Sequence, residues 1–174
     1  PARAALQLPK LGLPAQPGAV SSLDGQALLA ACGVQTAAAK LAKTADEAVA
    51  AAQALGYPVV LKIESPDILH KTEAKGVALN LKDDGAVRAA HTQLVANAKQ
   101  YKADARIAGV LVQAMAQGEV ELVIGLKRDP TFGPVVMVGL GGVLIEVFKD
   151  VVFRAAPVTE GEALRMLEIG RAHV

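Results

Sequence analysis

The stretch SPDILHKTEAKG contains the residues of this chain that are best suited to chemistry. His70 lies there between charges of both signs, directly after the apolar run PVVLKI. A neutral imidazole is a nucleophile, so a histidine held near bound phosphates is a candidate for covalent phosphoryl transfer. Lys71 beside it would favour the neutral ring, and three carboxylates close in sequence could orient a ring nitrogen: Glu64, Asp67 and Glu73. A solvated loop histidine without a role is the competing interpretation.

Lys62 lies inside the apolar run, where an ammonium group is costly unless it is paired or reaches a cleft. One interpretation is an edge-strand lysine whose charge extends to water. The other is a phosphate ligand at the end of a strand. Position alone leaves both interpretations open.

The histidines give no evidence of a metal site. His70 and His91 lack the spacing of paired metal ligands. His91 lies in the middle of an expected helix among polar neighbours, and we expect it to have no role in a site.

Two further features lie toward the end of the chain. Glu121 is an acidic residue in the apolar run VELVIG, and it is either an outward-facing residue or a carboxylate that faces a nucleotide or metal. The sequence GLGG at 139–142 follows a strand, so its amides could approach phosphates closely, although it fits neither of the common phosphate-loop patterns. A charged cluster follows and is interpreted as solvated surface: Glu146, Lys149, Asp150 and Arg154.

An alternation of helices and strands must position these residues. Helical spacing and caps predict helices over 21–33, 44–56, 83–100 and 159–167, with T-x-x-E capping boxes at Thr44 and Thr159. In the third helix we expect a buried stripe of Val87, Ala90, Leu94 and Ala98. Apolar runs predict strands over 34–42, 58–63, 77–81, 107–116, 120–129, 134–142 and 150–157. This order favours an α+β (α/β) fold with a first lobe over 21–116 and a second over 117–167.

Composition excludes several classes of protein. The chain has 174 residues, of which 52% are hydrophobic, enough for one good core or two small ones. A net charge of +1 and an aromatic content of 3% argue against a nucleic-acid surface. Cys32 is the only cysteine, which excludes a disulfide framework and a thiolate metal site. No apolar run reaches the roughly 20 residues that a bilayer span needs, and no leader opens the chain, so we expect a cytoplasmic protein without a membrane partner.

The two ends are expected to lie outside the folded lobes. Residues 1–20 are rich in Pro and Gly and are typical of a linker from an upstream domain, and the start at Pro1 indicates a piece of a longer chain. The end, EIGRAHV at 168–174, is encoded by a common sequencing-adapter DNA read in one frame. We hypothesise that this tail is non-native; native codons for it at the re-amplified locus would contradict the hypothesis.

Two long segments resemble a known enzyme family. They are GYPVVLKIESPDILHKTEAKGVALNL and GVLVQAMAQGEVELVIGLKRDPTFGPVVMVGLGGVLIEVFKDVVFRAAPV, and together they cover roughly residues 22–167. Both are similar to the nucleotide-binding part of the NDP-forming acyl-CoA synthetases, the group of the ADP-forming acetyl-CoA synthetases and relatives of the succinyl-CoA synthetase beta subunit. The motifs SPDILHK, RDPTFGP and GLGG carry the resemblance. It implies an ATP-grasp fold, in which two α+β lobes close on a nucleotide, with the second lobe truncated here.

The resemblance also implies roles for individual residues. Lys62 would contact the nucleotide phosphates, Glu121 would bind the ribose side of the nucleotide, and His70 would be phosphorylated as a shuttle. An acyl phosphate would first give its phosphate to another histidine in the CoA-ligase part, and the His70 loop would then carry it to ADP. The other implied nucleotide-binding residues belong to the hinge between the lobes and to the glycine-rich loop: Gln113, Ala114, Met115, Ala116, Gly141 and Gly142.

The implied reaction is the reversible conversion of an acid, CoA and ATP to acyl-CoA, ADP and phosphate. The expected cofactors are ATP or ADP with Mg²⁺, whose ligands would lie beyond the end of this chain, and CoA, bound by missing domains. The expected partners are CoA-binding and acyl-CoA ligase domains, fused upstream or in a separate subunit, and a small carboxylic acid. We expect no nucleic-acid partner, a homo-oligomer when the enzyme is intact, and no turnover by this chain alone.

Two other interpretations stay open. The same domain serves as a nucleotide-binding regulatory domain in bacterial protein lysine acetyltransferases, although relatives of that type tend to lose the shuttle histidine and this chain has His70. A stand-alone nucleotide-binding module without chemistry is the second. The chain also departs from many relatives, which read HKxxxGG, because Lys75 precedes Gly76. A side chain there either stiffens the loop or adds a phosphate contact.

Overall fold

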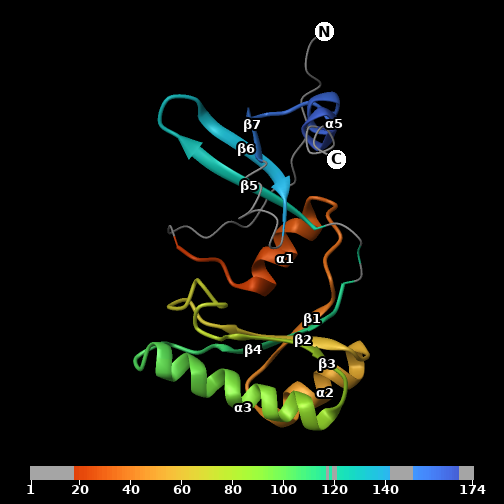
Figure 1. Ribbon diagram of the computed structural model, residues 1–174, viewed down its shortest axis with the longest axis vertical. Helices are drawn as coiled ribbons and strands as arrows, with labels where there is room; N and C mark the ends of the chain where they lie inside the picture. Colours follow the sequence, from red (N-terminus) through yellow and green to blue (C-terminus); the bar gives the residue numbers. More distant parts are fainter. Residues whose placement is uncertain (1–17, 117, 119–120, 142–150, 169–174) are drawn as a thin grey trace. The chain divides into compact units, whose positions relative to one another are not determined.

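The computed structural model describes residues 18–116, 118, 121–141 and 151–168 of the chain (Figure 1). These residues fall into two compact units, the first ending at residue 116 and the second containing the described residues from 118 onward. Residues 1–17 of the predicted linker, residues 142–150, and residues 169–174 of the predicted tail lie outside the described residues.

The first unit is a four-stranded antiparallel sheet with helices α2 and α3 on one face (Figure 1). The strand order is β1-β4-β2-β3, and all neighbouring strands run antiparallel. Its elements are α1 (Ser22–Ala31), β1 (Ala39–Ala42), α2 (Ala45–Leu55), β2 (Val59–Glu64), β3 (Val77–Leu81), α3 (Asp84–Tyr101) and β4 (Gly109–Ala114).

The core of this unit lies between the sheet and the two helices. Val59, Leu61 and Ile63 of β2 are buried in it, together with Val110 and Val112 of β4. Because side chains alternate along a strand, the residues between them lie on the opposite face of the sheet. The run PVVLKI is therefore confirmed as a strand, and it occupies an interior position in the sheet.

Strand β1 is shorter than predicted. The run 34–42 forms a strand only over Ala39–Ala42, where each residue has a partner on β4. The residues before it are mostly exposed, so little burial supports extending the strand. The prediction from apolar composition alone therefore made this strand too long.

Two helices begin at the predicted T-x-x-E sequences. Thr44 accepts the N–H of Glu47 at 3.1 Å, and the Glu47 carboxylate accepts the N–H of Lys43 at 2.6 Å, one residue before the cap. At the other helix, Thr159 accepts the N–H of Glu162 at 3.3 Å, and the Glu162 carboxylate accepts the N–H of Thr159 at 2.7 Å. The second pair is the complete reciprocal capping box.

The second unit is a three-stranded antiparallel sheet with one helix. Strands β5 (Leu122–Asp129), β6 (Gly133–Leu140) and β7 (Val151–Ala155) follow in the order β5-β6-β7, and α5 (Glu160–Glu168) comes after them. Met166 of α5 is buried. The predicted strands are thus confirmed over slightly different ranges, and the last helix is confirmed one residue further along the chain than predicted.

His91, which was expected to have no role in a site, is buried on the core face of α3. The buried residues of the helix are Val87, His91, Leu94 and Ala98, and the predicted Ala90 is partly buried and packs against the same core. The residue is 7% exposed, and its Nε2 has no hydrogen-bond partner among the described residues. The four positions recur at helical spacing, which was the signal in the sequence for a buried histidine.

We expect His91 to make the stability of the first unit depend on pH. Burial lowers the pKa of His91 below 6.5, and the nearby Glu47 carboxylate offsets only part of this effect. As the pH falls through 6.5, His91 binds a proton in the unfolded chain but stays neutral in the folded chain. The free energy of unfolding therefore decreases toward acid, by at most about 1.4 kcal/mol per pH unit.

Replacing His91 with leucine should remove this slope between about pH 7 and pH 5. Urea denaturation of both proteins across that range measures it. An equal slope in the two proteins would contradict the assignment of the pH dependence to His91.

Candidate functional site

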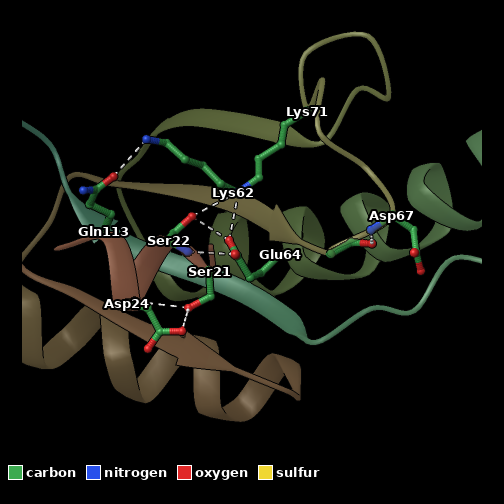
Figure 2. A network of polar contacts seen from close by, with 9 residues as sticks. Ser21, Ser22, Asp24, Lys62, Glu64, Asp67, Lys71 and Gln113 are labelled. Carbon is green, nitrogen blue, oxygen red and sulfur yellow. Dashed lines mark hydrogen bonds and ion pairs between the residues drawn. The ribbon is translucent and has the colours of Figure 1, made fainter. Parts of the chain in front are cut away.

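The face of the first sheet opposite α2 and α3 carries the predicted phosphate-binding lysine. Lys62 Nζ donates a hydrogen bond to Gln113 Oε1 on the neighbouring strand β4, at 2.9 Å (Figure 2). The structure thus brings together two residues that were predicted separately to bind the nucleotide. Because β2 is an interior strand, the interpretation of Lys62 as an edge lysine does not apply.

The ammonium of Lys62 is partly buried and has no carboxylate partner among the described residues. Burial lowers the pKa of Lys62, and the charge of Lys71 lowers it further. A partly desolvated ammonium that is bonded to a neutral amide is stabilised more by an incoming anion than an ammonium that already pairs with a carboxylate. This position is therefore suited to a phosphate group.

A second polar group on the same face joins β2, the loop and the start of α1. The Glu64 carboxylate accepts hydrogen bonds from the Ser22 N–H at 2.9 Å, the Ser22 hydroxyl at 2.7 Å and Lys71 Nζ at 2.8 Å (Figure 2). Burial by itself would raise the pKa of Glu64, but the hydrogen bonds from Lys71 and Ser22 outweigh it, so the pKa lies below its ordinary value. Ser22 is the first residue of α1, and a helix N-terminus also favours a carboxylate.

His70 is exposed, and its imidazole has no hydrogen-bond partner among the described residues. The expectation that Glu64 or Asp67 orients the ring is wrong, because Glu64 pairs with Lys71 and Asp67 pairs with Arg106. Glu73 makes no hydrogen bond to the ring within the described part of the chain either. Both ring nitrogens are thus available to a reacting group.

The start of the loop is fixed to the rest of the unit. The Asp67 carboxylate accepts hydrogen bonds from the Arg106 N–H, Nε and Nη2 at 2.8, 2.9 and 2.8 Å. The Arg106 guanidinium holds the pKa of Asp67 well below its usual range. The next residue, Ile68, is buried in the core, whereas Leu69 and His70 are exposed. The loop therefore leaves the core at Leu69.

The end of the loop closes at Gly76. Its N–H donates to the Lys71 carbonyl at 2.7 Å, and its carbonyl accepts the N–H of Ile63 at 2.8 Å. Lys75 has a φ of 48°, a left-handed conformation that glycine adopts at lower cost, and Asn97 Nδ2 donates to the Lys75 carbonyl at 2.9 Å. The lysine at this position thus adds backbone strain to the loop, and a phosphate contact by its side chain stays a prediction.

Replacing Gly76 with alanine should lower the free energy of unfolding by about 1–3 kcal/mol, because the added methyl group overpacks the turn. A Cβ there would lie 2.5 Å from Ile63 Cγ2 and 3.0 Å from the Lys71 carbonyl oxygen.

Gly25 of α1 is the matched control, since a Cβ there meets nothing within 4 Å. Alanine at position 25 should raise the stability by about 0.5–1 kcal/mol. Chemical denaturation measures both, and a Gly76 variant as stable as the wild type would contradict this packing.

Two cavities flank the loop within the first unit. One of about 350 Å³ is lined by Val20 before α1 and by Glu64 and Lys71, among others. The other, of about 200 Å³, is lined by residues that include Lys75 and Asn97. The loop thus has open space beside it, although its two ends are fixed.

The predicted hinge residues come last in the first unit. Ala114 is the final residue of β4, and Met115 and Ala116 follow it with exposed side chains. Their position in the chain agrees with a connection between units, whereas their role toward an adenine base stays a prediction.

The second unit brings two more of the predicted residues together. The Gly141 N–H donates to the Glu121 carbonyl oxygen at 2.7 Å. A Cβ on Gly141 would lie 2.7 Å from Glu121 Cγ, so glycine is required for this close approach. Gly142 lies outside the described residues, as do Glu146, Lys149 and Asp150 of the charged cluster, whereas Arg154 is exposed on β7.

The described residues contain neither a cluster of metal-ligating side chains nor a helix suited to a membrane. No group of three or more His, Cys, Asp or Glu side chains there could hold a metal ion. No helix in that part of the chain has the length and apolar character to cross a bilayer. The expectation that metal ligands lie elsewhere stays a prediction.

Three residues of this site were missed in the sequence: Ser22, Asn97 and Arg106. Ser22 contacts Glu64 across 42 residues of sequence. Asn97 contacts Lys75 across 22 residues, and Arg106 contacts Asp67 across 39. No local pattern specifies such pairings.

Comparison with known proteins gives clear matches. Residues 13–173 match the ATP-grasp domain family. The chain is 50% identical over 144 residues to the ADP-forming 4-hydroxybutyrate–CoA ligase of Nitrosopumilus maritimus, covering 83% of this chain and 21% of the relative. It is 42% identical over 150 residues to subunit beta of the ADP-forming acetate–CoA ligase I of Pyrococcus furiosus, covering 86% of this chain and 65% of that subunit. The chain thus spans less than two thirds of the length of either relative.

Solved structures of the dinucleotide-forming acetyl-coenzyme A synthetase 1 of Ca. Korarchaeum cryptofilum also match. The complex with coenzyme A and Ca-AMPCP has a TM-score of 0.81 at 43% identity, covering 86% of this chain and 65% of that one. In another structure the phosphohistidine segment is phosphorylated and in the site I orientation (TM-score 0.73, 41% identity, coverage 88% and 66%). In a third it points towards the nucleotide-binding site (TM-score 0.67, 39% identity, coverage 86% and 63%).

Proposed function

We propose, since this chain belongs to the ATP-grasp domain family, that it is the nucleotide-binding part of an ADP-forming acyl-CoA synthetase. Its fold is the ATP-grasp fold, present here as a partial domain. The proposed reaction converts an acid, CoA and ATP reversibly to acyl-CoA, ADP and phosphate. The ADP-forming CoA ligases among its relatives support this function over that of a regulatory domain in a lysine acetyltransferase.

Lys62 is the proposed phosphate ligand. Its partly buried ammonium has the Gln113 amide as its hydrogen-bond partner and no carboxylate among the described residues. A nucleotide phosphate would supply the negative charge that this position lacks, and Gln113 would fix the direction in which the lysine points.

His70 is the proposed carrier of the phosphoryl group. In the direction of ATP synthesis, a ring nitrogen attacks the phosphorus of the donor, and an N–P bond forms as the bond to the donor breaks. A β-phosphate oxygen of ADP then attacks the same phosphorus, the N–P bond breaks, and ATP is formed. The observation that carries this proposal is the exposed imidazole without a partner, in a loop fixed at both ends.

The remaining predicted residues would enclose the nucleotide. Ala114, Met115 and Ala116 are proposed to line the adenine pocket, together with Gln113. Glu121 is proposed to bind the ribose side. Gly141 is proposed to bring its backbone close to phosphates, and its tight approach to Glu121 places both at one point of the second unit.

The cofactors are proposed to be ATP or ADP with Mg²⁺. No group of three or more His, Cys, Asp or Glu side chains among the described residues could hold the Mg²⁺ ion by itself. CoA and the small acid would bind to CoA-binding and acyl-CoA ligase domains, either fused to this part or in a separate subunit. We propose that the intact enzyme is a homo-oligomer.

The nucleotide product of the intact enzyme tests the proposed reaction. With an acid, CoA and ATP, we expect acyl-CoA, ADP and phosphate in equal amounts, separated by liquid chromatography. Acetate and 4-hydroxybutyrate are the first acids to use, because ligases for these acids are among the relatives. Formation of AMP and pyrophosphate would contradict the proposal. Acetylation of protein lysines without ADP formation would favour the regulatory alternative.

A further inference from the structure

Lys71, Glu64 and Ser22 form a cluster, called the latch below, that connects the residue after His70 to the sheet (Figure 2). Lys71 Nζ lies 2.8 Å from Glu64 Oε2 and 3.1 Å from Ser22 Oγ. Ser22 donates two hydrogen bonds to the same carboxylate, at 2.9 and 2.7 Å. The start of α1, the end of β2 and the loop therefore meet at one charge pair.

The latch is better shielded from water than an ordinary surface ion pair. The side chains of Lys71 and Glu64 are 23% and 11% exposed, whereas those of the Arg88–Asp46 pair are 52% and 84% exposed. Water and salt weaken exposed pairs, whereas removing one partner of a shielded pair leaves an uncompensated charge. The latch is therefore costly to open.

The latch lies between the two fixed ends of the loop. Asp67 and Ile68 hold the start, and Gly76 closes the end. Between these ends the imidazole of His70 has no partner within the described residues, and the side chain that follows it is the one bound to Glu64. Opening the latch would therefore free the loop from β2 and α1 at Lys71, while the bond from the Gly76 N–H to the Lys71 carbonyl still closes the loop on itself.

The latch also determines which face of the sheet the loop approaches. Glu64 and Lys62 are two residues apart on β2, so their side chains lie on one face. Lys71 reaches that face from the loop, because its Nζ is bonded there to Glu64 Oε2 at 2.8 Å. The latched loop thus holds the backbone beside His70 near the proposed phosphate ligand.

We propose that the latch holds the His70 loop in the orientation that exchanges phosphate with the nucleotide. This inference rests on the proposed function of His70 as the phosphoryl carrier. Lys71 and Glu64 are positioning residues in this scheme, because they act through His70 without touching the reacting atoms. With the latch open, the loop can turn about its fixed ends toward the other phosphoryl donor; the corresponding segment of the Korarchaeum enzyme has been solved in two orientations.

The two half-reactions of the intact enzyme test the latch separately. Glu64→Gln and Lys71→Met each remove one charge, and Lys71→Arg retains it. We expect the rate of His70 labelling from γ-labelled ATP to fall roughly tenfold in both charge-removing variants, which is the loss of one shielded charged hydrogen bond. Labelling from acyl-CoA and labelled phosphate should change by less than about twofold, and the double variant should be no slower than either single one. Lys71→Arg should retain most of the wild-type rate.

Hydrogen exchange gives a readout that does not depend on activity. The amides of Ala74, Lys75 and Gly76 are bonded within the loop, and they should exchange faster in Glu64→Gln while the amides of β2 stay protected. Arg88→Gln, which breaks the exposed pair with Asp46, is the matched control and should change neither exchange nor labelling.

An equal loss in both half-reactions, or loop exchange unchanged by Glu64→Gln, would overturn the latch. A wild-type enzyme that takes no label on His70 from either donor would instead overturn the proposed function. The two failures are therefore distinguishable.

Discussion

Replacing His70 with asparagine is expected to lower the rate of acyl-CoA synthesis by at least about a thousandfold, because the nucleophile of both half-reactions is lost. Nucleotide affinity should stay within about twofold of the wild-type value. The imidazole is exposed and bonds to no other described residue, so its removal leaves the Lys62–Gln113 contact in place. Steady-state assays and titration calorimetry of the intact enzyme measure the two quantities.

Thr72→Ala is the matched control for this variant. Thr72 lies two residues further along the same loop, and its side chain is exposed. Its backbone carbonyl, which accepts the N–H of Lys75, is unaffected by the change. The control should retain the wild-type rate within about twofold. A His70 variant that turns over as fast as this control would show that phosphate does not pass through His70.

Replacing Lys62 with methionine is expected to weaken nucleotide binding by about 10–100-fold, which is the loss of one charged hydrogen bond to phosphate. Methionine matches the length of the apolar part of the side chain, so packing on β2 is largely retained. The loss should be greater for ATP and ADP than for adenosine, because the proposed partner of Lys62 is a phosphate. Calorimetric titration with the three ligands measures this difference.

Lys40→Met provides the comparison for Lys62. Lys40 lies on the edge strand β1 of the same sheet and is exposed. The Lys40→Met substitution therefore changes the net charge by the same amount as Lys62→Met without altering the proposed site. Its nucleotide affinity should equal that of the wild type within about twofold. If both lysine variants weaken binding to the same small extent, Lys62 acts through net charge alone and is not a phosphate ligand.

Local signals in the sequence were sufficient for most elements. The capping residues Thr44 and Thr159 fixed the starts of two helices, since their partners lie three residues away in the chain. The apolar run PVVLKI, which contains Lys62, indicated a strand, and the structure adds that this strand lies between two others. Such features depend on neighbours in sequence, so pattern alone can predict them.

Pairings between distant segments could not be predicted in the same way. Proximity in sequence suggested that Glu64 and Asp67 could orient the imidazole of His70, yet Glu64 pairs with Lys71 and Asp67 pairs with Arg106. Ser22 reaches Glu64 across 42 residues and Arg106 reaches Asp67 across 39. A periodic pattern defines a face but not the residue that packs against it.

The most direct test of the phosphoryl carrier is the label on His70 itself. The intact enzyme is incubated with Mg²⁺ and γ-labelled ATP beside its His70→Asn variant, and the acid and base stability of protein-bound label is compared. Acid-labile, base-stable label in the wild type, mapped by mass spectrometry to His70 and absent from the variant, is the predicted result. Nucleotide binding without any label on His70 would contradict the account and leave this chain as a nucleotide-binding domain without phosphoryl transfer.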